Sequence, residues 1–220
     1  MDVSGIRSEV ERAVAHEAEH GAFRASVMSA IEKAKPMMDA AERERMAETV
    51  VREVRAFVES APTVVEATVQ AAEEAGVVEQ VKPIFETALS YTQEDGDFIP
   101  DRLGLAGLID DAYLIHGLMQ EISERHRILS GRTLLPSGPF VVMQDIKRLI
   151  GEPTATRLEM AIVAFARRQN VKDTIEQIYR RIGGPGLSMD LPASVMMPGE
   201  RSPLADVPDL DLAKMWSSGG

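Results

Sequence analysis

The chain contains no cysteine, and this absence removes several kinds of chemistry at once. Disulfide bonds, thiolate metal sites and cysteine nucleophiles are excluded, and the composition favours a reducing compartment. The sequence also has no apolar run that approaches the ~20 residues of a membrane-spanning helix. Its first residues lack the basic start and apolar stretch of a signal peptide. We therefore expect a cytoplasmic protein.

Basic and aromatic residues are both scarce. The 24 Lys and Arg side chains are outnumbered by 35 Asp and Glu, which gives a formal charge of −11 and a pI near 4.9. Most of this surface would repel a phosphate backbone, so we expect no nucleic-acid partner. Because aromatics make up only 5%, the core must be built mainly from Val, Ile, Leu, Ala and Met. This mixture predicts an all-α, multi-helix bundle.

The spacing of apolar residues predicts seven to nine helices in one domain, residues 1–182. Pro36 and Pro62 are expected to end helices, Gly76 to interrupt one, and Pro83 to open another. A turn-rich loop is expected at 92–102. The helices are expected at 4–34, 38–60, a third from 64, a short one from 83, and then 103–129, 140–150, 153–169 and 171–182.

Residues 183–220 differ from the rest because proline and glycine are frequent among polar and acidic residues. We expect an irregular acidic C-terminal tail. Its end carries a short apolar cluster that includes the only tryptophan. Two interpretations stay open: the cluster docks on a partner protein, or it packs against its own domain. The cluster consists of Leu210, Leu212, Met215 and Trp216.

The sharpest match to a catalytic motif is the His-Glu-x-x-His pattern that runs from His16 to His20. On a helix, His16 and His20 share one face and can bind zinc, with Glu17 as the general base that activates water. However, Glu19 places a charge in a stretch that metalloproteases usually keep uncharged, and no later motif supplies an obvious third ligand. The segment therefore fits an exposed helix face better, and a metal-dependent hydrolase is the alternative.

A second group of residues lies between 97 and 111. Asp97 is followed by Ile99-Pro100-Asp101, a spacer, Gly107-Leu108-Ile109-Asp110-Asp111 and an apolar helix. This order resembles the signature of the YkvA-type family of small helical domains of unknown function, over about residues 83–125. One departure is visible, because a second proline usually falls between the two elements and residues 102–106 contain none. The resemblance implies a helical hairpin with a tight turn, and it implies no activity.

The first part of this motif also has a direct physical interpretation. Asp97 or Asp101 is expected to cap the following helix, because a carboxylate at a helix N-terminus accepts hydrogen bonds from free amides and complements the helix dipole. Pro100 is expected to stiffen the entry to that helix. Gly104 and Gly107, which lack a side chain, are expected to allow neighbouring helices to approach closely.

The second part places two acids beside an apolar helix. Adjacent helical positions point about 100° apart, so we expect that Asp110 and Asp111 do not both face the core and that one meets a basic or amide partner. Two alternatives remain, a partner-binding surface or a divalent-cation site formed by the four aspartates of the motif and His116. Otherwise His116 and His126 are expected to be satisfied by neighbouring carboxylates.

These observations favour a non-enzymatic helical module with an interaction, regulatory or scaffold role, with no cofactor. The partner is expected to be another protein or a second copy of the chain. Helices 4–34 and 38–60 suit self-association, because they combine apolar stripes with charged backs. The alternatives are a metal-dependent hydrolase that uses His16, Glu17 and His20, and a peripheral membrane-associated module, although the chain lacks a basic amphipathic face for anionic lipid.

Overall fold

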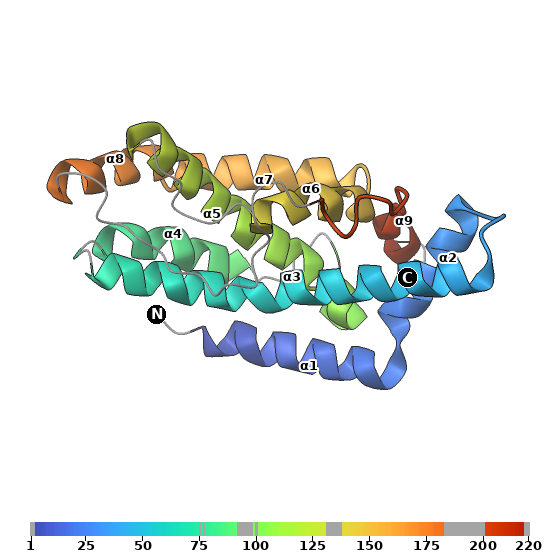
Figure 1. Cartoon of the computed structure of the whole chain (residues 1–220). Helices are drawn as coiled ribbons and strands as arrows, with labels where there is room; N and C mark the ends of the chain where they lie inside the picture. The colour runs from blue at the N-terminus through green and yellow to red at the C-terminus, as the bar shows by residue number, and fades with distance from the viewer. Residues whose placement is uncertain are drawn as a thin grey trace.

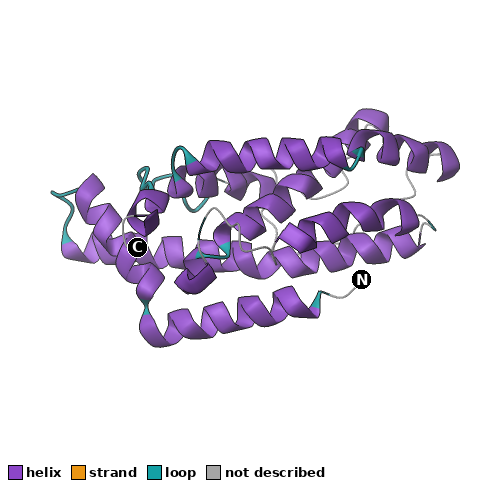
Figure 2. Cartoon of the chain, turned by 180° about the vertical axis from the view of Figure 1, so that it is seen from behind, coloured by secondary structure: helices purple, strands orange, loops and turns teal. Residues whose placement is uncertain are grey.

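The computed structural model describes residues 3–74, 76, 78–91, 99, 101–130, 138–182 and 201–217. This part of the chain is mostly helical and contains no strand (Figure 2), which confirms the predicted all-α class. No described helix combines the length and low charge that a membrane span requires. The elements are α1 (Ser4–His20), α2 (Ala22–Ala34), α3 (Ala40–Glu74), α4 (Val78–Tyr91), the 3₁₀ helix η1 (Asp101–Ala106), α5 (Ile109–Ser130), α6 (Gly138–Ile150), α7 (Thr154–Arg168), α8 (Val171–Ile182) and α9 (Leu212–Ser217).

The longest helix, α3, extends along most of the molecule (Figure 1). The helix α1 lies along one side of it, α6, α7 and α8 lie on the other side, and α5 crosses obliquely between them and α3. Its first half packs against α2 and its last half against α4. The short C-terminal helix α9 lies near α2, at the end of the bundle opposite to α8.

The helix α5 is the centre of this arrangement. Every residue from Ile109 to Met119 is buried, and α5 contacts α3, α4, α6, α7 and α8. A helical segment that is covered on all sides cannot place its polar residues in solvent, so each buried polar residue needs a partner within the protein. The buried polar residues of α5 are Asp110, Asp111, His116, Ser123 and His126.

The prediction that Pro62 ends a helix is wrong, because α3 continues through it to Glu74. A proline inside a helix costs about 3 kcal/mol, since it removes a backbone hydrogen bond and crowds the preceding turn. Around Pro62, however, α3 packs against α5, and Ala61, Val64 and Val65 are at most 3% exposed. Burial of these side chains offsets the local penalty, so packing decides the outcome.

Three other predicted boundaries are also wrong. Gly21 divides the expected helix 4–34 into α1 and α2, because it adopts the left-handed conformation with φ 61°. Pro83 lies inside α4 and does not open it. The expected helix 103–129 begins as η1, which has a kink at Gly104 (φ 62°, ψ −126°), and α5 starts only at Ile109. The predicted break at Gly76 is confirmed, with φ 64°.

The crossing of α5 and α7 depends on a glycine. A methyl group on Gly117 would lie 2.2 Å from Cδ1 and 2.9 Å from Cγ1 of Ile162. We expect Gly117→Ala to destabilise the protein, because overpacking costs about 1–3 kcal/mol and outweighs a gain of about 1 kcal/mol in helix propensity. Denaturant unfolding measures this difference.

The same substitution is expected to have the opposite effect when Ile162 is shortened. In an Ile162→Ala background the added methyl group has space, so Gly117→Ala should raise the free energy of unfolding relative to that background. A stabilising effect of Gly117→Ala in the wild-type chain would contradict the close packing.

Candidate functional site

The C-terminal segment of residues 201–217, here called the strap, is folded onto the helical body. It contains two turns, closed by Ala205 N–H to the Ser202 carbonyl and by Val207 N–H to the Leu204 carbonyl, both at 3.0 Å, and it ends in α9. The helix α9 packs against α2 and α6. This part of the predicted irregular tail is therefore ordered by its own domain. The buried apolar residues of the strap are Leu204, Val207, Leu210, Leu212, Ala213 and Trp216.

The tryptophan of the strap faces α2. The ring of Trp216 lies 6.3 Å from that of Phe23, tilted by 42°. Leu212 is fully buried, and Met215 is half-buried against the same core. The residues that the sequence suggested as a docking motif thus contact the chain's own body, which is one of the two interpretations left open.

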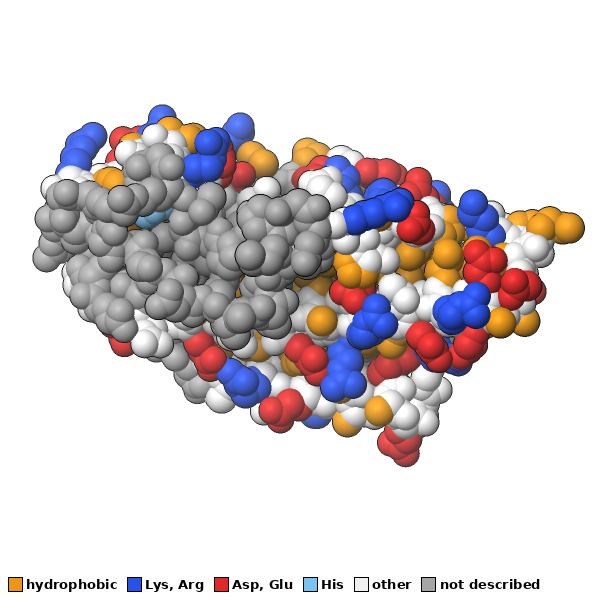
Figure 3. Space-filling model, viewed as in Figure 1, with side chains coloured by type: hydrophobic (Ala, Val, Ile, Leu, Met, Phe, Trp, Pro, Cys, Tyr) orange, Lys and Arg blue, Asp and Glu red, His pale blue; other side chains and the backbone are white. Residues whose placement is uncertain are grey.

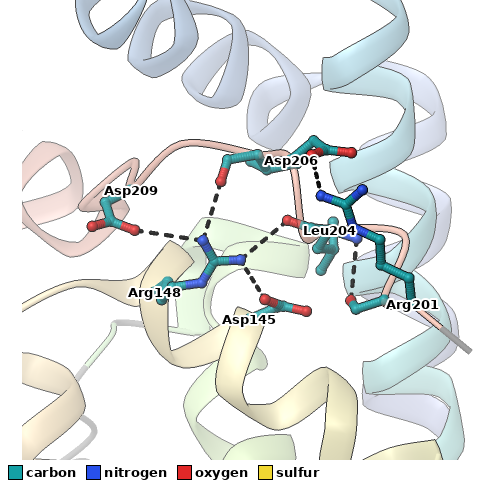
Figure 4. A network of polar contacts seen from close by, with 8 residues as sticks. Asp145, Arg148, Arg201, Leu204, Asp206 and Asp209 are labelled. Carbon is teal, nitrogen blue, oxygen red and sulfur yellow. Dashed lines mark hydrogen bonds and ion pairs between the residues drawn. The ribbon is translucent and has the colours of Figure 1, made fainter. Parts of the chain in front are cut away.

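The side chain of one arginine of α6 binds main-chain carbonyl groups of the strap (Figure 4). Arg148 donates from Nη1 to the Val207 carbonyl oxygen at 3.3 Å and from Nη2 to the Leu204 carbonyl oxygen at 3.2 Å. Its Nη1 also lies 3.8 Å from Asp209 Oδ1. A guanidinium presents several donors in a fixed plane, so it can bind two carbonyl groups at once. The strap is therefore bound partly through atoms that every peptide has.

Asp145 orients this arginine. Its carboxylate accepts a hydrogen bond from Arg148 Nη2, and its side chain is only 11% exposed. The two residues lie three positions apart on α6, so they share one face of the helix. Sequence reasoning missed both residues. The available signal was an acid, Asp145, placed between Met143 and Ile146 on the apolar stripe of α6, because a buried acid requires a partner.

The docked strap also contains unfavourable features. Asp211 has φ 50°, in the left-handed region that aspartate adopts more readily than most residues other than glycine, though at some cost. It lies against Gly151, where a methyl group would be 2.6 Å from the Asp211 Cα. Among the described residues, the buried Trp216 Nε1 and Asp211 Oδ1 have no hydrogen-bond partner. Each such group costs about 1–3 kcal/mol, so these costs offset part of the apolar burial.

The glutamate of the His-Glu-x-x-His segment has a structural partner. Glu17 accepts hydrogen bonds from the backbone N–H groups of Phe23 at 2.8 Å and Arg24 at 2.9 Å, one on each carboxylate oxygen. These amides belong to the first turn of α2, where N–H groups have no partner within the helix. Glu17 therefore caps α2 across the bend at Gly21, and both of its oxygens are used.

The two histidines of this segment lie on one face, as predicted, and their rings stack at 4.4 Å. His20 Nδ1 lies 3.2 Å from the His16 carbonyl oxygen of its own helix. His16 lies against Gly104, where a methyl group would be 3.2 Å from its Nδ1. The fold thus brings the two sequence motifs together by packing. Within the described part of the chain, no three metal-binding side chains form a group.

The two adjacent aspartates are both buried, so the expectation that only one faces the core is wrong. Asp110 is 0% exposed and Asp111 is 6% exposed. Asp110 Oδ2 accepts a hydrogen bond of 3.0 Å from Ile99 N–H, while Asp111 points toward α1, beside Ile6 and Val10. Both directions are covered because neighbours surround the start of α5. The predictions for Asp97, Pro100 and the Asp101 side chain lie outside the described residues.

The buried histidines have partners other than the carboxylates that were expected. His116 Nδ1 lies 2.7 Å from the Ala112 carbonyl oxygen, so Nδ1 carries the ring proton, and Nε2 lies 2.9 Å from the Ser60 hydroxyl. Burial lowers the pKa of His116 to about 4. His126 Nδ1 lies 3.2 Å from the Tyr179 hydroxyl oxygen. Burial also lowers the pKa of His126.

A groove of about 540 Å³ lies between α5, α7 and α8. Ile128 and Val163 are exposed in it, at 58% and 42%. Its charged residues have both signs, because Glu121 and Asp173 accompany Arg167 and Lys172. The described part of the face in Figure 3 likewise has basic side chains interspersed with acidic ones. Such mixed charge selects no single class of ligand, so the strap and its surface form the most specific candidate site.

The cap formed by Glu17 can be tested by substitution. We expect Glu17→Ala to lower the free energy of unfolding by about 1 kcal/mol, because two amides of α2 lose their partner. His20→Ala should change it by less than about 0.5 kcal/mol, since the side chain is exposed. Denaturant unfolding compares the two variants. An equal loss in both would contradict a role for Glu17 that is independent of the histidines.

His116 makes stability depend on pH. Its pKa is about 4 in the folded chain, below the ordinary value of 6.5, so the unfolded chain binds the proton first as pH falls. Stability from this residue is complete above pH 6.5 and is lost as pH falls toward 4. Between pH 7 and pH 5 we expect the stability advantage of the wild type over His116→Gln to narrow by about 2 kcal/mol. A pH-independent difference would contradict this.

Comparison with known proteins gives no relative from which to assign a function. No family model matches the chain, and no curated protein or solved structure shows significant similarity to it. The resemblance of residues 83–125 to the YkvA-type family stays a prediction.

Proposed function

We propose that this protein is a non-enzymatic interaction module that binds short amphipathic segments on the surface formed by α2 and α6. The strap occupies this surface in the isolated chain and acts as an internal ligand. The observation that carries the proposal is the way in which Arg148 holds the strap, through the carbonyl oxygens of Leu204 and Val207. Apolar side chains of the strap, among them Leu212 and Trp216, are buried as well.

This combination is typical of peptide recognition. Contacts to main-chain atoms supply affinity for an extended segment, and pockets for alternate side chains supply specificity. The strap combines both kinds of contact. Its turn-rich part is bound through backbone carbonyl groups, and α9 buries apolar side chains. A ligand of this kind needs apolar anchors at helical spacing and an acid near Arg148, the position that Asp209 occupies in the strap.

The costs of the docked strap support a regulatory role. Ordering the 17 residues of the strap on the body costs about 1–2 kcal/mol of free energy per residue in lost conformational entropy. The Trp216 N–H, which has no hydrogen-bond partner among the described residues, reduces the net gain further. Because these costs offset part of the apolar burial, a competing segment can displace the strap, and its release would uncover the surface without disturbing α5.

Neither alternative function gains support from the described residues. A hydrolase that uses His16, Glu17 and His20 would need a free carboxylate at Glu17, whereas both oxygens accept backbone hydrogen bonds. A membrane-associated module would need an apolar face with basic residues, and on the described part of the face in Figure 3 the basic side chains are interspersed with acidic ones. The apolar stripes of α1 to α3, on which self-association was expected to rest, place Val10, Val27 and Val54 in the core of the single chain.

The proposal can be tested with a full-length variant whose strap is disabled. Leu212→Asp with Trp216→Ser removes the two main anchors and leaves the surface intact. A synthetic peptide of residues 201–217 then carries the only tryptophan in the sample. We expect saturable binding of the peptide, seen as a shift of its emission to shorter wavelength when the indole leaves water. The wild-type chain should bind the peptide more weakly, because its own strap competes.

The matched controls reverse one charge at a time. Adding Arg148→Glu to the disabled variant should weaken peptide binding about 10- to 100-fold, because it removes charge-assisted hydrogen bonds worth about 1.5–3 kcal/mol each. Arg157→Glu, an exposed position on α7, should leave binding unchanged. Absence of saturable binding to a disabled variant that unfolds like the wild type would refute the proposed function.

A further inference from the structure

We infer that the partner of this surface is a second copy of the chain, bound by exchange of straps. The inference rests on the proposed function and specifies its ligand. In an exchanged pair, the strap of each copy lies on α2 and α6 of the other. Every contact seen within one chain is then made between chains, so the pair needs no additional complementarity.

The arrangement of the chain favours exchange. The helix α8 and the strap lie at opposite ends of the bundle (Figure 1), and α9 packs on α2 and α6. Residues 183–200, 18 in number, connect them and include four glycines and three prolines. A connection of this length reaches at most roughly 60 Å. The strap itself consists of two turns and α9, so it can be exchanged as one unit.

The partners of the strap are also distant in sequence. Arg148 precedes the two carbonyl groups that it binds by 56 and 59 residues, and Phe23 belongs to the second helix of the chain. Nothing in these contacts depends on covalent continuity. Tethering only raises the local concentration of the strap, so docking within one chain dominates when the protein is dilute and exchange gains as concentration rises.

The shape of the surface selects the strap's own sequence. Gly151 has φ 83°, and its missing side chain leaves space for the backbone of Asp211. Asp211 in turn adopts φ 50° and pairs with Lys214 within α9. An unrelated helical segment would have to reproduce this close approach. A second copy supplies it without change, which makes the chain itself the best-matched ligand.

Complementation between two defective full-length chains tests the exchange. The first chain carries Leu212→Asp and Trp216→Ser, so its strap is disabled and its surface is intact. The second carries Arg148→Glu, so its surface is disabled and its strap is intact. Alone, each chain should remain near 24 kDa, and Trp216 of the second should emit as a solvent-exposed indole. Light scattering after chromatography and tryptophan emission follow the mixture.

On mixing, we expect a species of about twice the 24.1 kDa of one chain and a shift of Trp216 emission to shorter wavelength. When the second chain carries Arg157→Glu in place of Arg148→Glu, we expect no shift of Trp216 emission directly after mixing, because the strap of that chain is already docked on its own body. If the two chains do not combine although the first binds the 201–217 peptide, exchange is wrong and the proposed function stands. If the first chain binds neither peptide nor the second chain, both proposals are wrong.

Discussion

Burial of the first half of α5 on all sides is the constraint on which the rest of the bundle depends. Its first eleven residues are buried, so each polar group among them has to find a partner within the protein. Asp110 meets the amide of Ile99, and His116 meets Ser60 of α3. These contacts fix how the surrounding segments approach α5, because an unpaired buried polar group costs more than a hydrogen bond returns.

The strap stands outside this constraint. Its helix α9 contacts α2 and α6, and its main polar anchor, Arg148, lies at the end of α6 and is 38% exposed. The described hydrogen bonds of Asp110 and His116 are made with Ile99, Ala112 and Ser60, which lie outside the strap. The molecule thus combines a core whose partners are fixed by desolvation with a peripheral segment that is held by a few apolar side chains and one guanidinium. Such peripheral elements open at a lower free energy than the core.

Sequence patterns predicted the parts of the fold that local chemistry determines. The expected helices 140–150, 153–169 and 171–182 match α6, α7 and α8 within two residues, because glycine, proline or asparagine lies at each boundary. Pro62 was misinterpreted, since the burial that stabilises α3 comes from α5, more than 40 residues later. Leu212 and Trp216 were recognised as a cluster, but Arg148 was not. Its partners are carbonyl groups, which every residue has and no sequence pattern reveals.

The features that make the strap imperfect also make it selective. Asp211 in its left-handed conformation and the side-chain-free surface of Gly151 fit one another. Among the described residues, the buried Trp216 N–H has no hydrogen-bond partner, which adds a cost to the docked strap. The close fit at Gly151 favours the strap's own sequence over an unrelated segment, while the costs offset part of the gain from apolar burial. These two properties are the basis on which we propose that the surface under the strap is a binding site.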